Sequence, residues 1–361
     1  MIIFRYLAKE VFLTLISLTA ILMLIFLSNQ FILYLNRAAS GNIPGVIVMK
    51  LMMFEMPTLA GYLLPLGFYM ALLLAYGRLY AESEMTVLRA NGYGPNQLLK
   101  HSYMMAGLVA TLVAAMMIWA SPLIAVERSK LFSSAGIQTL IQTIAPGRFR
   151  STNHGNQVFY VQSMGRDHKK AEQVFLARQS QQNNQTHWDV LWADKAFAET
   201  DPKTSENYLV LQTGKEYRGV PGQADYQVAE FAEYKTRLPH PEVALNDDDV
   251  RTYKIGRLLH LYNSAHLEAA AELQWRLSVP LMVLTLTLVA VPLSRVNART
   301  GKFAKLLPAI LLYILYANGM FVARDAMASG KIPLWMGMWW LHLSVVVLGL
   351  ILIWRNKVKL A

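Results

Sequence analysis

Long apolar runs constrain this sequence more than any other feature. A run of about 20 apolar residues can cross the hydrocarbon core of a membrane as a helix. Only 16% of the 361 residues are charged, whereas soluble domains carry about 25%. The long runs are residues 11–35, 46–76, 95–122, 277–293, 306–322 and 334–354. We therefore expect a polytopic α-helical membrane protein with six transmembrane helices.

The first run could instead belong to a signal peptide, because Arg5 and Lys9 precede it and small residues follow at 38–40. The apolar part of a signal peptide spans about 7–15 residues, which is much shorter than the run at 11–35. We expect a retained helix.

Residues from about 131 to 255 show a different pattern, in which apolar residues alternate and Gly, Asn, Gln and Asp become frequent. Short strand-like runs at regular spacing are typical of antiparallel β structure. These runs are residues 158–161, 174–177, 188–192, 208–211 and 226–234. We predict three parts: helices 1–3 in residues 1–126, an inserted all-β, jellyroll-like domain in 127–265, and helices 4–6 in 266–361.

The net charge of +11 does not indicate nucleic-acid binding. The chain has 34 basic and 23 acidic residues, and residues 124–270 contain 17 of each, so the whole excess lies at the ends of the apolar runs. Basic residues gather at cytoplasmic helix ends in membrane proteins. We expect no nucleic-acid partner.

The same basic residues predict the topology. Six spans place both termini on one side, and that side holds most of the short-loop cations. They are Arg5, Lys9, Arg78, Arg89, Lys100, Arg295, Arg299, Lys302, Lys305, Arg355, Lys357 and Lys359, against Arg37, Arg324, Lys331 and Lys50 on the other side. We expect cytoplasmic termini and an extracytoplasmic β domain.

Residues 77–94 form an unusual connector between two apolar runs. Ala81, Met85 and Leu88 share one helical face, and Gly92 and Gly94 are typical stop signals. The topology places this charged, amphipathic helix in the cytoplasm. It could rest on lipid headgroups, but its two acidic residues disfavour an anionic surface, so we favour docking to another protein.

Catalytic motifs are missing from the sequence. It contains no cysteine, no nucleotide-binding loop, no zinc-protease motif and no nucleophile elbow. His240 between two prolines and the run Asp247–Asp249 are better explained as linker residues than as metal ligands. We expect no catalytic residue, metal or cofactor, and a non-enzymatic transporter subunit whose energy comes from a partner.

Four segments carry a family resemblance across the whole chain in order. They are IFRYLAKEVF at 3–12, GNIP at 41–44, RLYAESEMTVLRANG at 78–92 and ELQWRLSVPLMVLTLTLVAVPLS at 272–294. Together they resemble the LptF/LptG lipopolysaccharide export permeases, and more closely the LptF branch. The resemblance implies a multi-pass protein of the inner membrane of a Gram-negative bacterium, with a periplasmic β domain.

The resemblance also implies partners and an ATPase-coupling site. The partners would be a homologous LptG-like permease, an LptB-like ATPase dimer and an LptC-like periplasmic β-jellyroll protein. The family's coupling-helix glutamate corresponds to Glu84 through the A-E-S-E pattern, with Arg78, Glu82, Leu88 and Arg89 around it.

The lipid implied by the resemblance is lipopolysaccharide, which combines acyl chains with phosphates. An apolar lining with a basic rim would suit it. The candidates are Phe26, Phe31, Leu35, Leu311, Leu315 and Phe321 for the lining, and Arg37 and Arg324 for the rim. Contact with ordinary membrane lipid and interfacial anchoring are the alternatives. LptF relatives tend to carry basic residues in outer span 1, where this chain has Gln30 and Leu33.

Two other functions stay open from the sequence. One is the permease of another ABC-type envelope lipid or lipoprotein exporter. The other is a non-transporting membrane scaffold whose β domain binds envelope proteins. A scaffold would not need the connector at residues 77–94.

Overall fold

The structure, a computed structural model, describes residues 2–39, 43, 45–142, 147, 149–152, 157–164, 170–182, 185–200, 207–223, 226–237, 249–263, 266–296 and 305–358. The contacts divide the chain into two compact units. The first comprises Met1–Gln30, Met52–Glu127 and Asp247–Ala361, and the second comprises Phe31–Leu51 and Arg128–Asn246. The first unit is a helical bundle, and the second contains a β-sheet.

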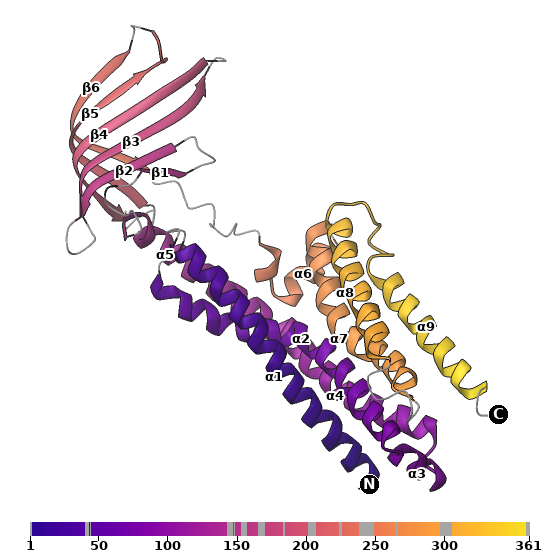
Figure 1. Cartoon of the computed structure of the whole chain (residues 1–361). Helices are drawn as coiled ribbons and strands as arrows, with labels where there is room; N and C mark the ends of the chain where they lie inside the picture. Colours follow the sequence, from indigo (N-terminus) through magenta and orange to yellow (C-terminus); the bar gives the residue numbers. More distant parts are fainter. Residues whose placement is uncertain are drawn as a thin grey trace. The chain divides into compact units, whose positions relative to one another are not determined.

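In the part of the chain that the structure describes, five helices are long and apolar enough to cross a membrane (Figure 1). They are α1 (Ile2–Ala39), α2 (Gly45–Ala81), the helix Pro95–Leu131, α7 (Leu267–Leu293) and α8 (Leu306–Ala328). The apolar part of α9 (Trp339–Val358) is shorter, at Trp339–Arg355. The polytopic helical class is confirmed, whereas the sixth span is not.

The third long helix is not regular along its length. It begins as α4 (Pro95–Ala115), widens into a π-helical turn, η1 (Met116–Ala120), and continues as α5 (Ser121–Gln142). Such turns insert one residue into an α-helix. Pro95 lies in the first turn of α4, where its missing N–H costs nothing.

Helix α7 lies at the centre of the bundle, where it packs against α4, α8 and α9. Its most apolar segment is 78% buried, compared with 11% for that of α1. Glycines allow close helix contacts: a Cβ on Gly67 of α2 would lie 2.5 Å from Thr19 Oγ1 of α1, and one on Gly349 of α9 would lie 2.7 Å from Leu288 Cγ of α7. Small residues at such crossings are typical of membrane helices.

The sheet of the second unit has six described strands in chain order, each antiparallel to the next. They are β1 (Phe149–Thr152), β2 (Gln157–Met164), β3 (Lys170–Gln182), β4 (Gln185–Thr200), β5 (Asn207–Gly219) and β6 (Gln227–Arg237). The five predicted strand runs lie within β2 to β6, except that the last run began one residue early. A jellyroll requires Greek-key connections, and this meander does not confirm that prediction.

The long strands bend along one line across the sheet (Figure 1). The register pairs skip Gln173 in β3 and Thr213 in β5, and these two residues have positive φ values of 50° and 52°. The bend lets one face bury its own side chains, including Phe159, Val161 and Leu211. Gly214 is required beside the bend, because a Cβ there would lie 2.2 Å from the Trp192 carbonyl oxygen.

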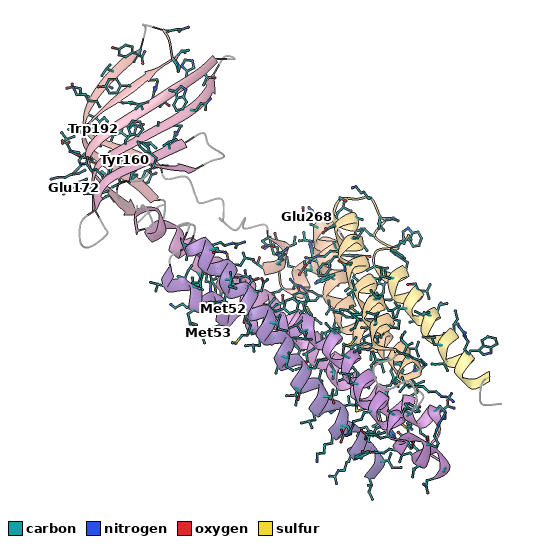
Figure 2. All side chains as sticks on the ribbon, viewed as in Figure 1. Met52, Met53, Tyr160, Glu172, Trp192 and Glu268 are labelled. Atoms are coloured by element: carbon teal, nitrogen blue, oxygen red, sulfur yellow. The ribbon has the colours of Figure 1, made fainter. Side chains whose placement is uncertain are left out.

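An aromatic row crosses the other face of the sheet. Phe149, Tyr160, Phe175 and Trp192 occupy successive register positions from β1 to β4. The Phe149 and Tyr160 ring centroids lie 4.7 Å apart, and Figure 2 labels Tyr160 and Trp192 on their strands. Phe149 is 70% exposed and Trp192 is 40% exposed, so this row forms an accessible apolar surface.

Candidate functional site

The charged connector forms a helix of its own, α3 (Glu84–Ala90). The single helix expected over residues 77–94 is wrong in one respect, because α2 continues to Ala81 and the chain turns sharply at Glu82 and Ser83. Ser83 has a left-handed φ of 63°, which breaks the helix. The C-terminal stop is as predicted: Gly92 has a φ of 83°, and the Tyr93 N–H donates to the Leu88 carbonyl.

The apolar face of α3 packs against the bundle. Met85 is 1% exposed, and Leu88 packs against the same core. The loop that follows is also fixed, because the Tyr93 hydroxyl lies 2.6 Å from Nδ1 of His101 in α4. Burial raises the pKa of Tyr93 to about 12, so this phenol stays protonated at neutral pH. The contacts hold α3 in a defined position.

The polar side chains around α3 pair with the start of α1. The Arg78 guanidinium donates to Glu10 Oε2 at 2.6 Å, and its other Nη lies 3.9 Å from Glu82. The Tyr6 hydroxyl donates to Glu84 Oε2 at 2.6 Å. The structure therefore gathers Arg78, Glu82 and Glu84 in one polar cluster. Sequence reasoning missed Tyr6 and Glu10, because nothing local links positions so far apart.

The other two predicted coupling residues have different surroundings. Leu88 contributes packing, as described. Arg89 lines a small cavity together with Arg295 from the segment that follows α7. The predicted set thus divides in two: Arg78, Glu82 and Glu84 form a polar cluster beside α1, and Arg89 lines a cavity beside the end of α7.

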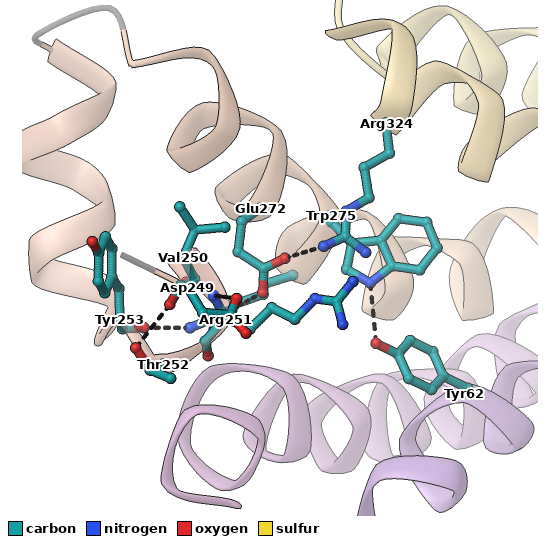
Figure 3. Close-up of polar contacts among 10 residues, drawn as sticks. Tyr62, Asp249, Val250, Arg251, Thr252, Tyr253, Glu272, Trp275 and Arg324 are labelled. Atoms are coloured by element: carbon teal, nitrogen blue, oxygen red, sulfur yellow. Dashed lines mark hydrogen bonds and ion pairs between the residues drawn. The ribbon is translucent and has the colours of Figure 1, made fainter. Parts of the chain in front are cut away.

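A second polar cluster surrounds the start of α7 (Figure 3). Glu272 is buried and accepts from two arginines: Arg276 Nε at 2.8 Å and Arg324 Nη2 at 2.5 Å. Arg276 is only 1% exposed. Its remaining N–H groups donate to the carbonyls of Arg251 at 2.9 Å and Tyr253 at 2.8 Å, beside the 3-10 helix η3 (Val250–Thr252). With one carboxylate and two guanidinium groups, the cluster carries a formal charge of +1.

Trp275 completes this cluster and was missed by the sequence analysis. The Arg324 guanidinium lies 5.0 Å from the Trp275 ring centroid, and the Phe321 ring centroid lies 4.8 Å from it. Tyr62 of α2 lies on the other side, with its hydroxyl 3.4 Å from Trp275 Nε1. The i, i+4 spacing of Glu272 and Arg276 in an apolar helix was the available signal for a buried pair.

The remaining predicted lipid-binding residues are exposed on their helices. Phe26, Leu311 and Leu315 belong to the first unit, and Phe31, Leu35 and Arg37 belong to the second. The apolar ones range from 38% exposure at Phe31 to 72% at Leu315. Only Phe321 and Arg324 of the predicted lipid-binding set meet around one residue. Among the described residues, no cluster of His, Asp or Glu could hold a metal ion.

These features define a class: a polytopic membrane protein with a β domain inserted between α5 and η3 and a short charged helix at one end of its bundle. Comparison with known proteins then identifies the family. The chain belongs to the family described as "Lipopolysaccharide export system permease LptF/LptG", whose profile matches residues 5–355.

Individual relatives agree with this assignment. The chain is 30% identical over 352 residues to the lipopolysaccharide export system permease protein LptF of Escherichia coli strain K12. The aligned region covers 98% of this chain and 94% of that protein. LptF proteins of Escherichia coli O157:H7 and Shigella flexneri match to the same extent. The predicted LptF/LptG resemblance is confirmed.

Proposed function

We propose that this permease subunit exports lipopolysaccharide with energy from a separate ATPase that docks on α3. The observation that supports the docking is the construction of α3. Its apolar face is buried against the bundle, whereas Glu84 and Glu82 remain at least partly accessible. A carboxylate on a firmly held helix suits a charge-assisted contact with a basic residue of a partner.

The proposed topology has six spans, with α9 as the sixth. Its apolar part of 17 residues, Trp339–Arg355, rises about 26 Å at 1.5 Å per residue, which suffices for a thin or locally adapted bilayer. Trp339 and Trp354 near its two ends suit the membrane interfaces. In this proposed topology, which the distribution of the basic residues supports, both termini and α3 lie in the cytoplasm and the sheet lies in the periplasm.

The proposed assembly contains a second, LptG-like permease, an LptB-like ATPase dimer and an LptC-like β-jellyroll protein. Burial supports a further membrane partner: the most apolar segments of α1 and α8 are only 11% and 22% buried. Membrane lipid alone could cover these faces of α1 and α8. If the same faces line a cavity for the transported lipid, however, a second protein must form the opposite wall. A homologous permease would supply that wall.

In the proposed lipid path, the exposed apolar residues of α1 and α8 contact acyl chains. They are Phe26, Phe31, Leu35, Leu311, Leu315 and Phe321, with Arg37 and Arg324 toward the phosphates. Glu272 pairs with both Arg276 and Arg324 and neutralises part of their charge. Arg324 would therefore attract a phosphate through the net positive charge of these three residues together. The lipid would continue along the β domain, which we propose to be jellyroll-like in the assembled exporter.

Replacement of Glu84 tests the docking. In the chain co-expressed with its ATPase, Glu84→Ala should weaken co-purification of the ATPase, and Glu84→Lys should abolish it by charge repulsion. Glu268→Ala is the matched control, because Glu268 is an exposed carboxylate at the opposite end of the helical unit (Figure 2). Unchanged co-purification and unchanged lipid export in both Glu84 variants would favour the scaffold function instead.

A further inference from the structure

A small cavity lies between α3 and the neighbouring ends of four long helices. Its volume is about 60 Å³. The walls come from the end of α2, α3, the first turns of α4, the last turn of α7 with the residues after it, and the end of α9. Its lining includes Leu98, Leu99, Val291, Ile353, Arg89 and Arg295. The cavity belongs wholly to the helical unit.

Two guanidinium groups give this cavity its charge. Arg89 comes from the last turn of α3, and Arg295 follows the end of α7. Both lie close enough to the hydroxyl of Tyr80, another lining residue, to act on it electrostatically. Lys305 adds a third cation near the cavity, because its Nζ donates to the Arg295 carbonyl at 2.5 Å. No carboxylate is among the residues that line the described cavity.

Apart from the Asn96 amide and the Tyr80 hydroxyl, the rest of the lining is apolar. Leu98, Leu99, Val291 and Ile353 are aliphatic, and Pro95 and Pro292 offer no backbone donor. A small hydrophilic anion could use the polar groups but would leave the aliphatic side chains of this lining without an apolar partner. A ligand that fits has an anionic head for the two arginines and a hydrocarbon part for the leucine, valine and isoleucine side chains.

The position selects among amphiphiles. The cavity lies where these helices reach one end of the bundle, which the proposed topology puts at the cytoplasmic membrane surface. Basic pockets between membrane helices bind anionic headgroups at that side. Arginine pairs with phosphate through two parallel hydrogen bonds. We propose that this cavity binds one anionic phospholipid of the adjacent leaflet, with its phosphate between Arg89 and Arg295 and its first acyl carbons against Leu98, Leu99 and Ile353.

Such a lipid would connect α3 to the ends of α7 and α9. The site is separate from the proposed lipopolysaccharide path, and its position at a headgroup layer rests on the proposed topology. Lipid binding at this cavity and ATPase docking at Glu84 can therefore fail independently.

The test uses the full-length chain, purified and delipidated in a mild detergent. Dioleoylphosphatidylglycerol is titrated into the micelles, and retained lipid is counted by native mass spectrometry, with the melting temperature as a second readout. Dioleoylphosphatidylcholine, which is zwitterionic, and inorganic phosphate at the same ionic strength are the comparison probes. We expect retention and a raised melting temperature with phosphatidylglycerol alone.

Variants locate the site. Arg89→Gln with Arg295→Gln should weaken phosphatidylglycerol binding by about tenfold or more, since both charge-assisted contacts to the phosphate are lost. Leu99→Phe should weaken it by filling the cavity. Arg5→Gln is the matched control, because Arg5 is an exposed arginine beside the same end of the bundle that does not line the cavity. It should bind like the unchanged chain.

Three results would overturn the proposal. They are equal retention of phosphatidylcholine, an equal effect of inorganic phosphate, and phosphatidylglycerol binding that survives both the double arginine variant and Leu99→Phe. If the double variant does not fold, a photoreactive phosphatidylglycerol on the unchanged chain replaces it. Crosslinks should map to residues 89–99 and 291–295, and their absence there would equally reject the site.

Discussion

The Tyr6 hydroxyl donates a 2.6 Å hydrogen bond to the Glu84 carboxylate across 78 positions of sequence. This bond joins the first turns of α1 to α3. The carboxylate that we propose for ATPase docking is therefore already oriented before a partner arrives. One of its oxygens is engaged by Tyr6, and the other remains available for a charged donor.

Tyr6→Phe separates the internal role of Glu84 from its external role. The variant removes one partly exposed hydrogen bond, so we expect a loss of stability of about 0.5–1.5 kcal/mol and near-normal ATPase co-purification. Glu84→Ala removes the same hydrogen bond, so it should cost a similar free energy of unfolding, but it should also abolish co-purification of the ATPase. Melting in detergent and co-purification measure the two effects. If Tyr6→Phe loses the ATPase as completely as Glu84→Ala does, the carboxylate acts by fixing α1.

Arg276 should be the most sensitive charged residue of the helical unit. Arg276→Met leaves the carbonyls of Arg251 and Tyr253 without their donor and leaves Glu272 with Arg324 alone. Removing one member of a buried ion pair costs about 3–5 kcal/mol, and we expect the lower end because Arg324 remains. The readout is thermal unfolding in detergent, with the exposed Lys254→Gln as control. Similar melting of the two variants would contradict the proposed burial energetics.

The α1–α2 crossing gives a prediction with a built-in rescue. Gly67→Ala would place a Cβ 2.5 Å from Thr19 Oγ1, and such overpacking costs about 1–3 kcal/mol. Thr19→Ala should restore most of the stability, because Thr19 Cβ lies at an ordinary 3.7 Å and only Leu15 Cδ1, at 3.2 Å, must then shift slightly. The Thr19 hydroxyl has no hydrogen-bond partner among the described residues, so its loss costs little. Gly107→Ala, where nothing lies within 4 Å, is the control. Melting of the single and double variants decides the matter; absence of rescue would show that Thr19 is not the obstacle.

The proposed lipid path predicts a pattern of crosslinks. Photoreactive residues at Phe31, Arg37 and Arg324 should capture lipopolysaccharide in membranes that contain the assembled exporter. Leu13 is the control, because it is also exposed on α1 but lies about 27 Å from Phe31 along the helix. If none of the three sites gave a crosslink, or if Leu13 captured lipopolysaccharide equally, these residues would not belong to the lipid path.

The sequence predicted the helices and most of the sheet because both depend on local periodicity. Apolar runs gave the long helices, and alternation located β2 to β6. The four residues of β1, Phe149–Thr152, contain one large apolar side chain and therefore gave no signal. The strands are also longer than predicted, because the bend at Gln173 and Thr213 interrupts the alternation.

Long-range contacts could not be predicted in the same way. The break between α2 and α3 depends on a left-handed serine, a residue type that seldom adopts this conformation. The pairing of Tyr6 with Glu84, and of Glu272 with Arg324, depends on how the helices pack. Sequence reasoning therefore named charged side chains of the candidate site but assigned them no internal partners. It treated Arg324 as a rim residue, although Arg324 forms an ion pair with Glu272.

The hydrogen bonds from Arg276 to the carbonyls of Arg251 and Tyr253 also determine how firmly this segment is attached to α7. These residues are among the first that the structure describes after the sheet. A flexible tether there would absorb any tension arriving along the backbone. Because hydrogen bonds from the buried Arg276 hold this segment against α7, a displacement of the segment would disturb α7, which packs against α4, α8 and α9. The segment that follows the sheet is thus rigidly attached to α7 as well as joined to it through the chain.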